Sequence, residues 1–396
     1  MSGGIHLVGF LKLAGEYSAG WRHPQSPAAA GVDLRFAQEQ TRRLEAVRFD
    51  AVFVPDLVGV PDTGPEVLER VATVNDSFEP TTLVAALSTV TDRIGLIATA
   101  STSYSRPEEV IGTFASLHRL SGARAGWNVV TSLNDAEARN YGRDAHLDHE
   151  VRYRRAEEFV DEVRSAWQEA GIRPVLAQAG SSDAGRGLAA RIADIVFARA
   201  LPLEETAALR RAIREQAASF GRDPESVRLL PELPVVVAAT RSEAEDAFAR
   251  VRDLLHPAVA LADVEYWTGT SLSHLPREAP LPPLPPLPAS RASRGAQAEI
   301  YRQAEREGLT IGDLARIVAD GDGAVIGSAG DVADYIEEYA SAGAVDGFTV
   351  SFPWQPGTLA AFTELVVPEL RRRGLFRLDY EGNTLREHLG LSRQRP

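Results

Sequence analysis

The residues Ala125–Asn134 combine an apolar run with a polar end. The run AGWNVV is followed directly by TSLN, and a helical stretch comes next. In a protein that alternates strands and helices, this arrangement predicts a strand that presents polar groups to a ligand at its C-terminal end. Asn128 and Thr131 are therefore candidate ligand-binding residues.

The ends of the other predicted strands carry mainly hydroxyl and aromatic groups, and those of interest are Asp56, Ser101, Thr102, Ser181, Ser182, Phe352 and Trp354. No two histidines have the spacing of a metal site, so we expect no metal and no hydrolytic metal chemistry. A glycosidase needs two facing carboxylates, and only Asp56 lies clearly at a strand end. Neutral hydrogen-bonding groups instead suit a cofactor that brings its own reactivity.

Residues in three further segments leave their role open. Ser181 or Ser182 can cap a helix that begins near residue 183, and the free amides at that helix N-terminus can also bind a phosphate. Arg152 and Tyr153 open an amphipathic helix after His149, and a lone His or Tyr in such a place is more often structural than a ligand. His23, in the sequence WRHP after the first predicted strand, can contact a substrate or pack its own loop.

Eight apolar runs separated by helical patterns supply the elements that position these residues. Strands are predicted near residues 5–13, 50–56, 93–100, 125–131, 174–179, 194–198, 232–239 and 346–352. Helices are predicted near 33–48, 80–90, 107–120, 150–169, 183–192, 204–219 and 241–255. This repeat favours one α/β domain over residues 1–396, a (β/α)₈ TIM barrel. An open doubly wound sheet is the alternative, but Lys12–Gly20 lacks the Gly-rich form that its first loop prefers.

Residues 263–300 interrupt the repeat. They contain the Leu-Pro run 280–288, and proline at this density excludes a helix or a central strand and favours an extended polyproline course. The Pro-rich insertion is therefore either an external loop or a lid segment over the barrel mouth.

Composition excludes several classes of protein. The chain has 396 residues, and its 42 basic and 55 acidic residues give a net charge of −13, which disfavours nucleic acids and anionic membranes as partners. With no cysteine, the chain has no disulfide, thiolate metal site or cysteine nucleophile. The N-terminus lacks the basic region of a signal peptide, and no run approaches the ~18 apolar residues of a membrane span. We expect a cytoplasmic protein.

Taken in order, segments along nearly the whole chain resemble the bacterial-luciferase-like flavin monooxygenases. The branch that they resemble contains the nitrilotriacetate, streptogramin-A, dibenzothiophene-sulfone and long-chain-alkane monooxygenases. The most specific segments are 120–132 and 178–186, and the others are 21–24, 49–53, 79–80, 93–102, 346–348, 367–376, 380–382 and 385–390.

This resemblance implies a two-component system in which a separate flavin reductase supplies reduced FMN. The enzyme would add dioxygen to it as a flavin hydroperoxide and oxygenate an organic substrate, and a homodimer or tetramer is expected. The protein positions the flavin and excludes water. By resemblance, Asp56, Ser101 and Thr102 line the ring edge, and Asn128 bonds to the ring or the ribityl chain. His149, Tyr153, Ser181 and Ser182 hold the ribityl and phosphate end. His23 lies near the reacting face and, with Asp56, is a candidate catalytic residue.

Two departures from the family pattern matter. Family members carry some forty residues between the end of the fourth helix and the fifth strand, whereas here Trp167 and the predicted strand are almost adjacent. We therefore expect a more open pocket, a larger or carrier-bound substrate, or help from the 263–290 segment. A family histidine ahead of the Trp-Arg pair falls here at Glu16 and Tyr17. Two other functions remain open: a deazaflavin-dependent hydride transferase on the same barrel, and a flavin-binding protein without catalysis.

Overall fold

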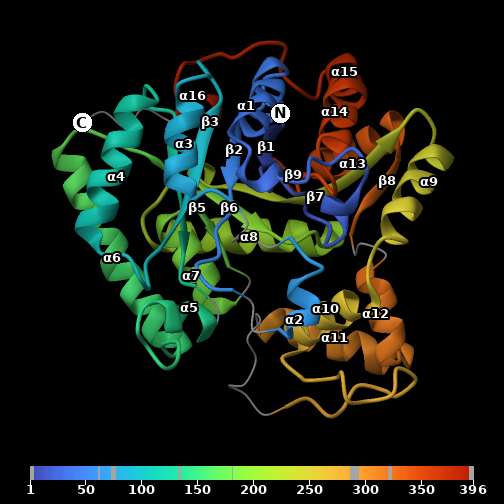
Figure 1. The fold of residues 1–396 in the computed structure, drawn as a ribbon. Coiled ribbons are helices and arrows are strands. Elements are labelled where there is room, and N and C mark those ends of the chain that lie inside the picture. Colours follow the sequence, from blue (N-terminus) through green and yellow to red (C-terminus); the bar gives the residue numbers. More distant parts are fainter. Residues whose placement is uncertain are drawn as a thin grey trace.

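The chain forms a closed parallel β-barrel with helices around it (Figure 1). The computed structural model describes residues 4–60, 63–72, 77–132, 135–180, 182–285, 294–319 and 323–391. The barrel strands are β1 (His6–Phe10), β2 (Ala51–Val54), β3 (Gly95–Ser101), β4 (Ala125–Val130), β5 (Val175–Ala179), β6 (Ile195–Ala198), β7 (Arg228–Ala238) and β9 (Gly347–Ser351). The eight predicted strands and the predicted TIM barrel are confirmed.

The ring closes because β9 pairs with both β7 and β1, while β6 pairs with β7. A ninth strand, β8 (Val325–Ser328), was not predicted. It pairs with Val235–Ala238 at the end of β7 and lies outside the ring. All these pairs are parallel, so the strand C-termini meet at one end of the barrel, here called the mouth.

Helices connect successive strands on the outside of the barrel. They are α1 (Leu34–Ala46), α2 (Pro65–Leu68), α3 (Pro80–Ser88), α4 (Pro107–Leu120), α5 (Asp135–Asn140), α6 (His149–Glu169), α7 (Asp183–Ile192), α8 (Leu203–Ser219), α9 (Arg241–Arg252) and α13 (Ala329–Ser341). At the C-terminus follow α14 (Gly357–Ala361), a π-helical turn (Phe362–Val366), α15 (Val367–Arg372) and α16 (Leu385–His388). Asp33 and Thr240 begin α1 and α9 by accepting backbone N–H groups of the first turn.

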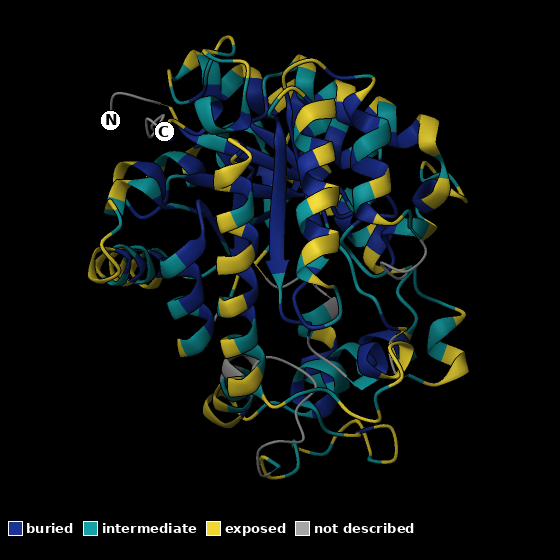
Figure 2. Ribbon diagram, turned by 90° about the vertical axis from the view of Figure 1, so that its left-hand side faces the viewer, coloured by how far each residue is buried: buried dark blue, intermediate teal, exposed yellow. Residues whose placement is uncertain are grey.

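Two cores hold the barrel together. One lies between strands and helices, where Trp127 packs against Phe114, Phe159 and Trp167. The other fills the barrel interior with inward strand residues and is closed from the N-terminal end by leucines of the α16 region, including Leu385. Figure 2 shows the consequence: buried strands inside and helices that expose only their outer face. The strand ends are therefore held rigidly.

An inserted helical unit lies between α9 and β8. It comprises α10 (Pro257–Thr268), α11 (Arg294–Glu307) and α12 (Ile311–Ala319), which share a small apolar core around Val264 and Leu314. Figure 1 shows the three helices together beside the mouth. The expectation of an extended course over 263–300 is thus wrong at both ends. Proline is absent from the interiors of α10 and α11, and Pro257 stands at the first position of α10, where proline favours a helix.

Between these helices, residues 269–285 contain neither helix nor strand, apart from one bridge between Pro280 and Thr310. Turns occupy much of 269–279. The described part of the Leu-Pro run, residues 280–285, contains no helix, so its polyproline course stays a prediction, and residues 286–288 lie outside the described residues. The short link between α6 and β5 is also confirmed, because α6 ends at Glu169 and β5 begins at Val175. Among the residues described, no helix is both long and apolar enough to cross a membrane.

Candidate active site at the barrel mouth

Asn128 faces the barrel interior from β4. A Cβ on Gly126 would meet Leu385 inside the barrel, so the alternation of the strand turns Asn128 the same way. Asn128 Nδ2 donates to Thr99 Oγ1 at 3.0 Å, and Thr99 donates to the Val54 carbonyl at 2.8 Å. These two bonds fix the orientation of the amide. Asn128 Oδ1 is buried and has no hydrogen-bond partner, so it calls for a ligand or water that donates an N–H or O–H.

The hydroxyls that end β3 have different tasks. Ser101 Oγ lies 2.8 Å from Ser132 Oγ and also accepts from the Ser103 amide at 3.2 Å. Thr102 is fully buried and donates to the Val130 carbonyl at 3.2 Å, which ties β3 to β4. Ser132 adopts a φ of 59°. Residues other than glycine that adopt this left-handed conformation cluster at binding and active sites. Ser101 therefore lies in a polar pair next to the mouth, whereas the Thr102 donor is used by the fold.

Asp56 follows β2 directly and is partly buried. Burial raises the pKa of Asp56 to about 6, the Leu57 amide opposes this, and the negative charges of Glu79 and Glu137 add to it. A carboxyl group that titrates close to neutral pH can accept and return a proton under working conditions. Asp56 thus has the titration range of an acid–base residue.

The first turns of α6 and α7 meet at the edge of the mouth. The rings of His149 and Tyr153 lie 4.7 Å apart, and Tyr153 Oη would be 3.1 Å from a Cβ placed on Gly185. A Cβ on Gly180 would lie 2.7 Å from Gly185 Cα, so only glycine permits this close approach. Ser182 Oγ accepts from the Gly185 amide at 3.1 Å and caps α7.

The cap considered for Ser182 is therefore present, and a phosphate role remains a prediction. Ser181, the other serine of this pair, lies outside the described residues.

His23 lies past the first strand and packs on a residue from the last one. Its ring stacks on Trp354 at 5.1 Å between centroids, and its Nδ1 accepts from the Gln25 amide at 3.2 Å. Burial and the charge of Arg250 lower the pKa of His23. The ring is therefore neutral near pH 7 and carries its proton on Nε2. The structure brings together His23 and Trp354, which the sequence placed on separate strand ends.

Sequence patterns missed a group of charged side chains across the mouth, here called the carboxylate cluster: Glu16, Glu232 and Asp263, with Lys12. Lys12 Nζ lies 3.7 Å from Glu16 Oε2, and Ser18 Oγ donates to Asp263 at 2.9 Å. Burial raises the pKa of Glu16 and of Asp263. Burial, reinforced by the charge of Glu16, raises the pKa of Glu232 to about 7. The available signal was a glutamate within the apolar run LLPELPVVVA.

A second missed group stands beyond the end of β3. The rings of Tyr104 and Tyr141 stack at 4.5 Å, and Tyr104 Oη lies 2.7 Å from His146 Nδ1. Burial raises the pKa of Tyr104 to about 12, and burial lowers the pKa of His146. This aromatic group walls the mouth between α4 and α6. No strand-end pattern reveals it, because its members come from two separate loops, one before α4 and one between α5 and α6.

The inserted unit contributes to the mouth through α10. Asp263 accepts a hydrogen bond from Ser18, which follows β1 in the chain. The guanidinium of Arg199, which follows β6, lies 5.3 Å from the centre of the Trp267 ring. Contacts with α2 continue this surface toward β2. Helix α10 therefore bridges the loops that follow several strands, in the place where a lid segment was one of two expectations.

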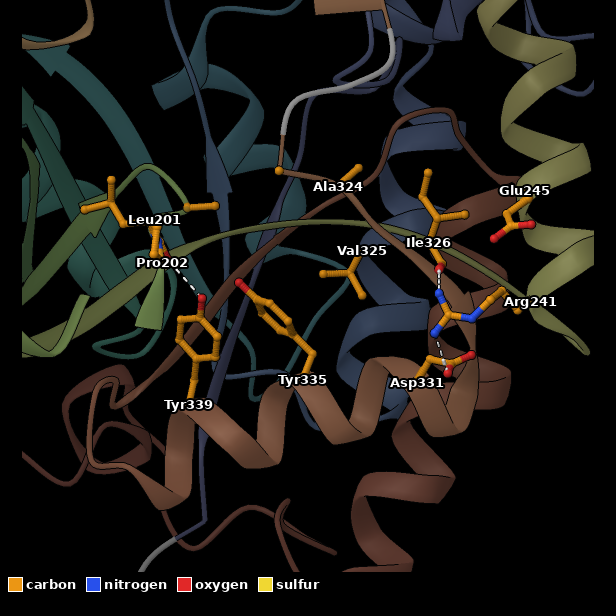
Figure 3. Close-up of a pocket in the computed structure, with 12 residues that line it drawn as sticks. Leu201, Pro202, Arg241, Glu245, Ala324, Val325, Ile326, Asp331, Tyr335 and Tyr339 are labelled. Carbon is orange, nitrogen blue, oxygen red and sulfur yellow. Dashed lines mark hydrogen bonds and ion pairs between the residues drawn. The ribbon is translucent and has the colours of Figure 1, made fainter. Parts of the chain in front are cut away.

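A separate hollow of about 710 Å³ lies beside β8 (Figure 3). Its sides are formed by Leu201 and Pro202 opposite Tyr335 and Tyr339, and by Arg241. Arg241 is held by Asp331 at 2.7 Å, and Tyr339 donates to the Leu201 carbonyl at 2.9 Å. None of the predicted site residues lines this hollow. We therefore place the candidate active site at the mouth.

Comparison with known proteins gives one consistent result. Residues 15–346 match the family described as luciferase-like monooxygenase. N-acetyl-S-(2-succino)cysteine monooxygenase of Bacillus subtilis is 37% identical, with 98% of this chain and 97% of that protein covered. One component of the pristinamycin IIA synthase of Streptomyces pristinaespiralis is 40% identical, with 99% and 97% covered.

A solved riboflavin lyase, which holds a modified FMN and riboflavin, has a TM-score of 0.84 and 28% identity, with 98% of this chain and 96% of that chain covered. The alignment with the Bacillus protein extends over 435 positions, more than the 396 residues of this chain. That relative therefore contains residues that this chain lacks, and the short link after Trp167 is where the sequence predicts such a loss.

Proposed function

This chain belongs to the luciferase-like monooxygenase family, and from that premise we propose that it is the oxygenase of a two-component system. Reduced FMN, delivered by a separate flavin reductase, supplies the two electrons with which one atom of dioxygen enters an organic substrate and the other leaves as water. The proposal includes a cytoplasmic location and a homo-oligomer, either a dimer or a tetramer.

The unsatisfied Asn128 Oδ1 is the observation that best supports this function. It is a buried acceptor whose amide is held in place from the other side by Thr99. An isoalloxazine ring in its reduced form offers N–H donors to such an acceptor, and Ser101 with Ser132 offers hydroxyls next to it. These residues fit a flavin ring edge because they can bind it without moving.

The start of α7 is proposed to hold the phosphate end. The amides at a helix N-terminus and the adjacent positive dipole favour an anion, and the glycine contact at Gly180 and Gly185 leaves the backbone bare there. Tyr153 Oη and the His149 ring from α6 stand over the same turn. Ser182 would then act twice, as helix cap and as part of the phosphate site.

Two side chains are placed to handle protons. Asp56 is proposed as the base, because it titrates near neutral pH at the end of β2. His23 is neutral and presents an Nε2 proton, so it is proposed as a hydrogen-bond donor toward the reacting oxygen. The stacked Trp354 holds the imidazole ring in place.

Exclusion of water is proposed to come from two walls. One is α10 of the inserted unit, and the other is the stacked pair Tyr104 and Tyr141 with His146. Together they stand in for the segment that is missing between α6 and β5. Shielding the site keeps reducing equivalents from escaping as hydrogen peroxide.

Anaerobic titration with photoreduced FMN tests this function. We expect wild-type protein to bind reduced FMN and Asn128→Ala to bind it at least about tenfold more weakly, because a hydrogen bond to a buried acceptor is lost. Ser116→Ala on the outer surface of α4 is the matched control and should bind like wild type. Equal affinity in Asn128→Ala would remove Asn128 from the site, and absence of binding in wild type would refute the function.

The same samples separate the two other functions. After mixing with dioxygen, a monooxygenase should release less hydrogen peroxide per reduced FMN than free flavin does once a substrate is present. A protein that binds reduced flavin but converts all the dioxygen consumed into hydrogen peroxide would be a flavin-binding protein without catalysis. Tight binding of a reduced deazaflavin with no oxygen uptake would identify a hydride transferase.

A further inference from the structure

The carboxylate cluster lies on the opposite side of the mouth from Asn128. Glu232 occupies an inward position on β7, in register with Thr349 on β9. Glu16 follows β1, and Asp263 approaches from α10. The cluster is therefore built by β1, β7, β9 and the inserted unit, whereas the groups proposed for FMN lie at the ends of β2 to β4 and at the starts of α6 and α7.

The charges of the cluster are not balanced internally. The charged groups that act on Glu232 are Glu16, Arg199 and Lys12, the Ser351 hydroxyl adds a hydrogen bond, and Asp263 faces the same lysine. Three carboxylates thus share Lys12 and an arginine that is itself exposed and lies over Trp267. The negative charge on this side of the mouth therefore favours binding of a cation.

Buried acceptors beside the cluster also lack donors. Gln355 is fully buried, and its Nε2 donates to the Lys12 carbonyl at 2.9 Å, so its Oε1 must be the free end of the amide. That Oε1 has no hydrogen-bond partner, and Glu16 Oε2 faces Lys12 Nζ at 3.7 Å, beyond ordinary hydrogen-bond distance. Ser351 lies next to Glu232 on the inward face of β9, is fully buried, and its hydroxyl faces the Glu232 carboxylate, whose pKa it lowers. Acceptors in excess call for a ligand that donates hydrogen bonds.

The floor beneath the cluster is aromatic. Phe10, Phe53 and Phe197 stack with ring centroids 5.4 to 6.0 Å apart inside the barrel. Phe10 and Phe197 remain partly exposed although they face inward, and 34% of the Glu16 side chain is exposed as well. Parts of the phenylalanine rings and of Glu16 are therefore accessible to solvent. Carboxylates above an aromatic floor are the surroundings in which proteins bind organic cations.

We propose that this side of the mouth is a substrate subsite for a cationic nitrogen, so that the molecule oxygenated here is an organic amine bound as its ammonium ion. Glu232 and Glu16 accept its charge, Gln355 Oε1 accepts a further hydrogen bond, and its carbon frame rests on Phe10 and Phe197. The reaction itself rests on the proposed function, but the binding of the cation does not. A polyanion is disfavoured, because it would bring like charge against these carboxylates.

Binding of three probes of the same shape tests the subsite without turnover. Benzylammonium, benzyl alcohol and benzoate are titrated into the purified protein by calorimetry at pH 8. We expect benzylammonium to bind at least about tenfold more tightly than benzyl alcohol, and benzoate to bind most weakly. Glu232→Gln should remove most of the preference for the cation. Glu245→Gln, an exposed carboxylate beside the other hollow, is the matched control and should leave it unchanged.

The pH dependence gives an independent measure. Because burial raises the pKa of Glu232 to about 7, the cluster gains negative charge between pH 6 and pH 8, while the amine remains protonated. Benzylammonium should therefore bind more tightly as pH rises through this window, and benzyl alcohol should not respond. Glu16→Gln is the second variant and replaces Glu232→Gln if the latter disturbs folding. Its dissociation constant for benzylammonium should also rise.

The outcomes separate this inference from the proposed function. Equal affinity for benzylammonium and benzyl alcohol, or no loss of preference in both variants, would overturn the ammonium subsite even if reduced FMN binds normally. Selective benzylammonium binding in a protein that does not bind reduced FMN would keep the subsite and refute the monooxygenase. Reduced FMN affinity within twofold of wild type in Glu232→Gln would show that the variant is folded.

Discussion

The two sides of the barrel mouth carry polar groups in different ways. On the β3–β4 side, Asn128, Ser101 and Thr102 are neutral and are tied to neighbouring strands by hydrogen bonds. On the β7–β9 side, Glu232 and Glu16 are charged groups in a low-dielectric space with raised pKa values. On the first side, hydrogen bonds to neighbouring strands hold these three side chains, and Asn128 Oδ1 is the one acceptor among them without a partner. The second depends on pH and on what fills the space next to it.

This difference divides the tasks of binding. Neutral groups held by backbone bonds place a ligand accurately at small electrostatic cost, as a cofactor site requires. Buried charges gain little from their own surroundings and discriminate strongly between ligands of different charge. We conclude that the β3–β4 side determines where the proposed cofactor lies, and the β7–β9 side determines which substrate is accepted.

Asp56→Asn is expected to have the largest effect. It removes the carboxyl group that titrates at about pH 6, so turnover should fall about 100-fold if Asp56 is the base. In wild type, kcat/KM should rise with pH as Asp56 loses its proton between about pH 5 and pH 7, and the variant should lose this limb. Steady-state rates across that range provide the measurement. A full rate with an unchanged pH limb would assign the base elsewhere.

Stability should not explain that loss. The folded-state pKa of Asp56 is raised, so the folded protein binds the proton more tightly and loses stability as pH rises through about 6. Asp56→Asn should therefore be at least as stable as wild type at pH 8. A melting temperature well below that of wild type would instead place Asp56 in the structure rather than in the chemistry.

The sequence predicted the fold well because the barrel repeats one physical pattern. Each of the eight inner strands is a short apolar run, and its helix has one apolar face, as in α1. Strand β8 was missed because three of its four residues are only partly buried and it pairs at one edge. The helices of the inserted unit were obscured by the Leu-Pro run between them, although α10 and α11 contain no internal proline.

The site could be predicted only where it follows directly from strand ends. Asn128 and Asp56 are found that way, because parallel strands bring their C-termini together. Glu232 lies in the middle of a strand, and its inward position is known only once the register with β9 is known. The contact of Tyr104 with His146 depends on how two loops fold, and no local pattern in the chain encodes it.

Glu232→Gln should change how stability depends on pH. Burial raises the pKa of Glu232 from 4.5 to about 7, so wild type should lose stability as pH rises from about 5 to 8. The variant keeps a neutral side chain and should be about 1–2 kcal/mol more stable than wild type at pH 8, with little difference at pH 5. Urea unfolding at both pH values checks this. If the stability difference between the two proteins is the same at both pH values, the charge of Glu232 is already compensated in the folded protein. The two sides of the mouth would then differ less in their electrostatics.

Ser182 allows the cap and the phosphate role to be separated. Ser182→Ala removes the hydrogen bond to the Gly185 amide and should cost about 1 kcal/mol of stability. Ser182→Asp keeps a capping oxygen but adds negative charge where the phosphate is proposed to bind. We expect near wild-type stability for Ser182→Asp with FMN affinity reduced about tenfold. If both variants bind FMN like wild type, Ser182 is only a cap.

Ser18→Ala is the mildest change and tests whether α10 belongs to the mouth. It removes the hydrogen bond from Ser18 Oγ to Asp263, which contributes about 0.5–1.5 kcal/mol, and leaves that carboxylate without this donor. Amide exchange in α10 should become faster, while exchange in β3 and β4 should not change. The benzylammonium affinity should change by less than threefold, since Glu232 and Glu16 are intact. Faster exchange in β3 as well would show that the two sides of the mouth are coupled, and that cofactor placement and substrate selection are not independent.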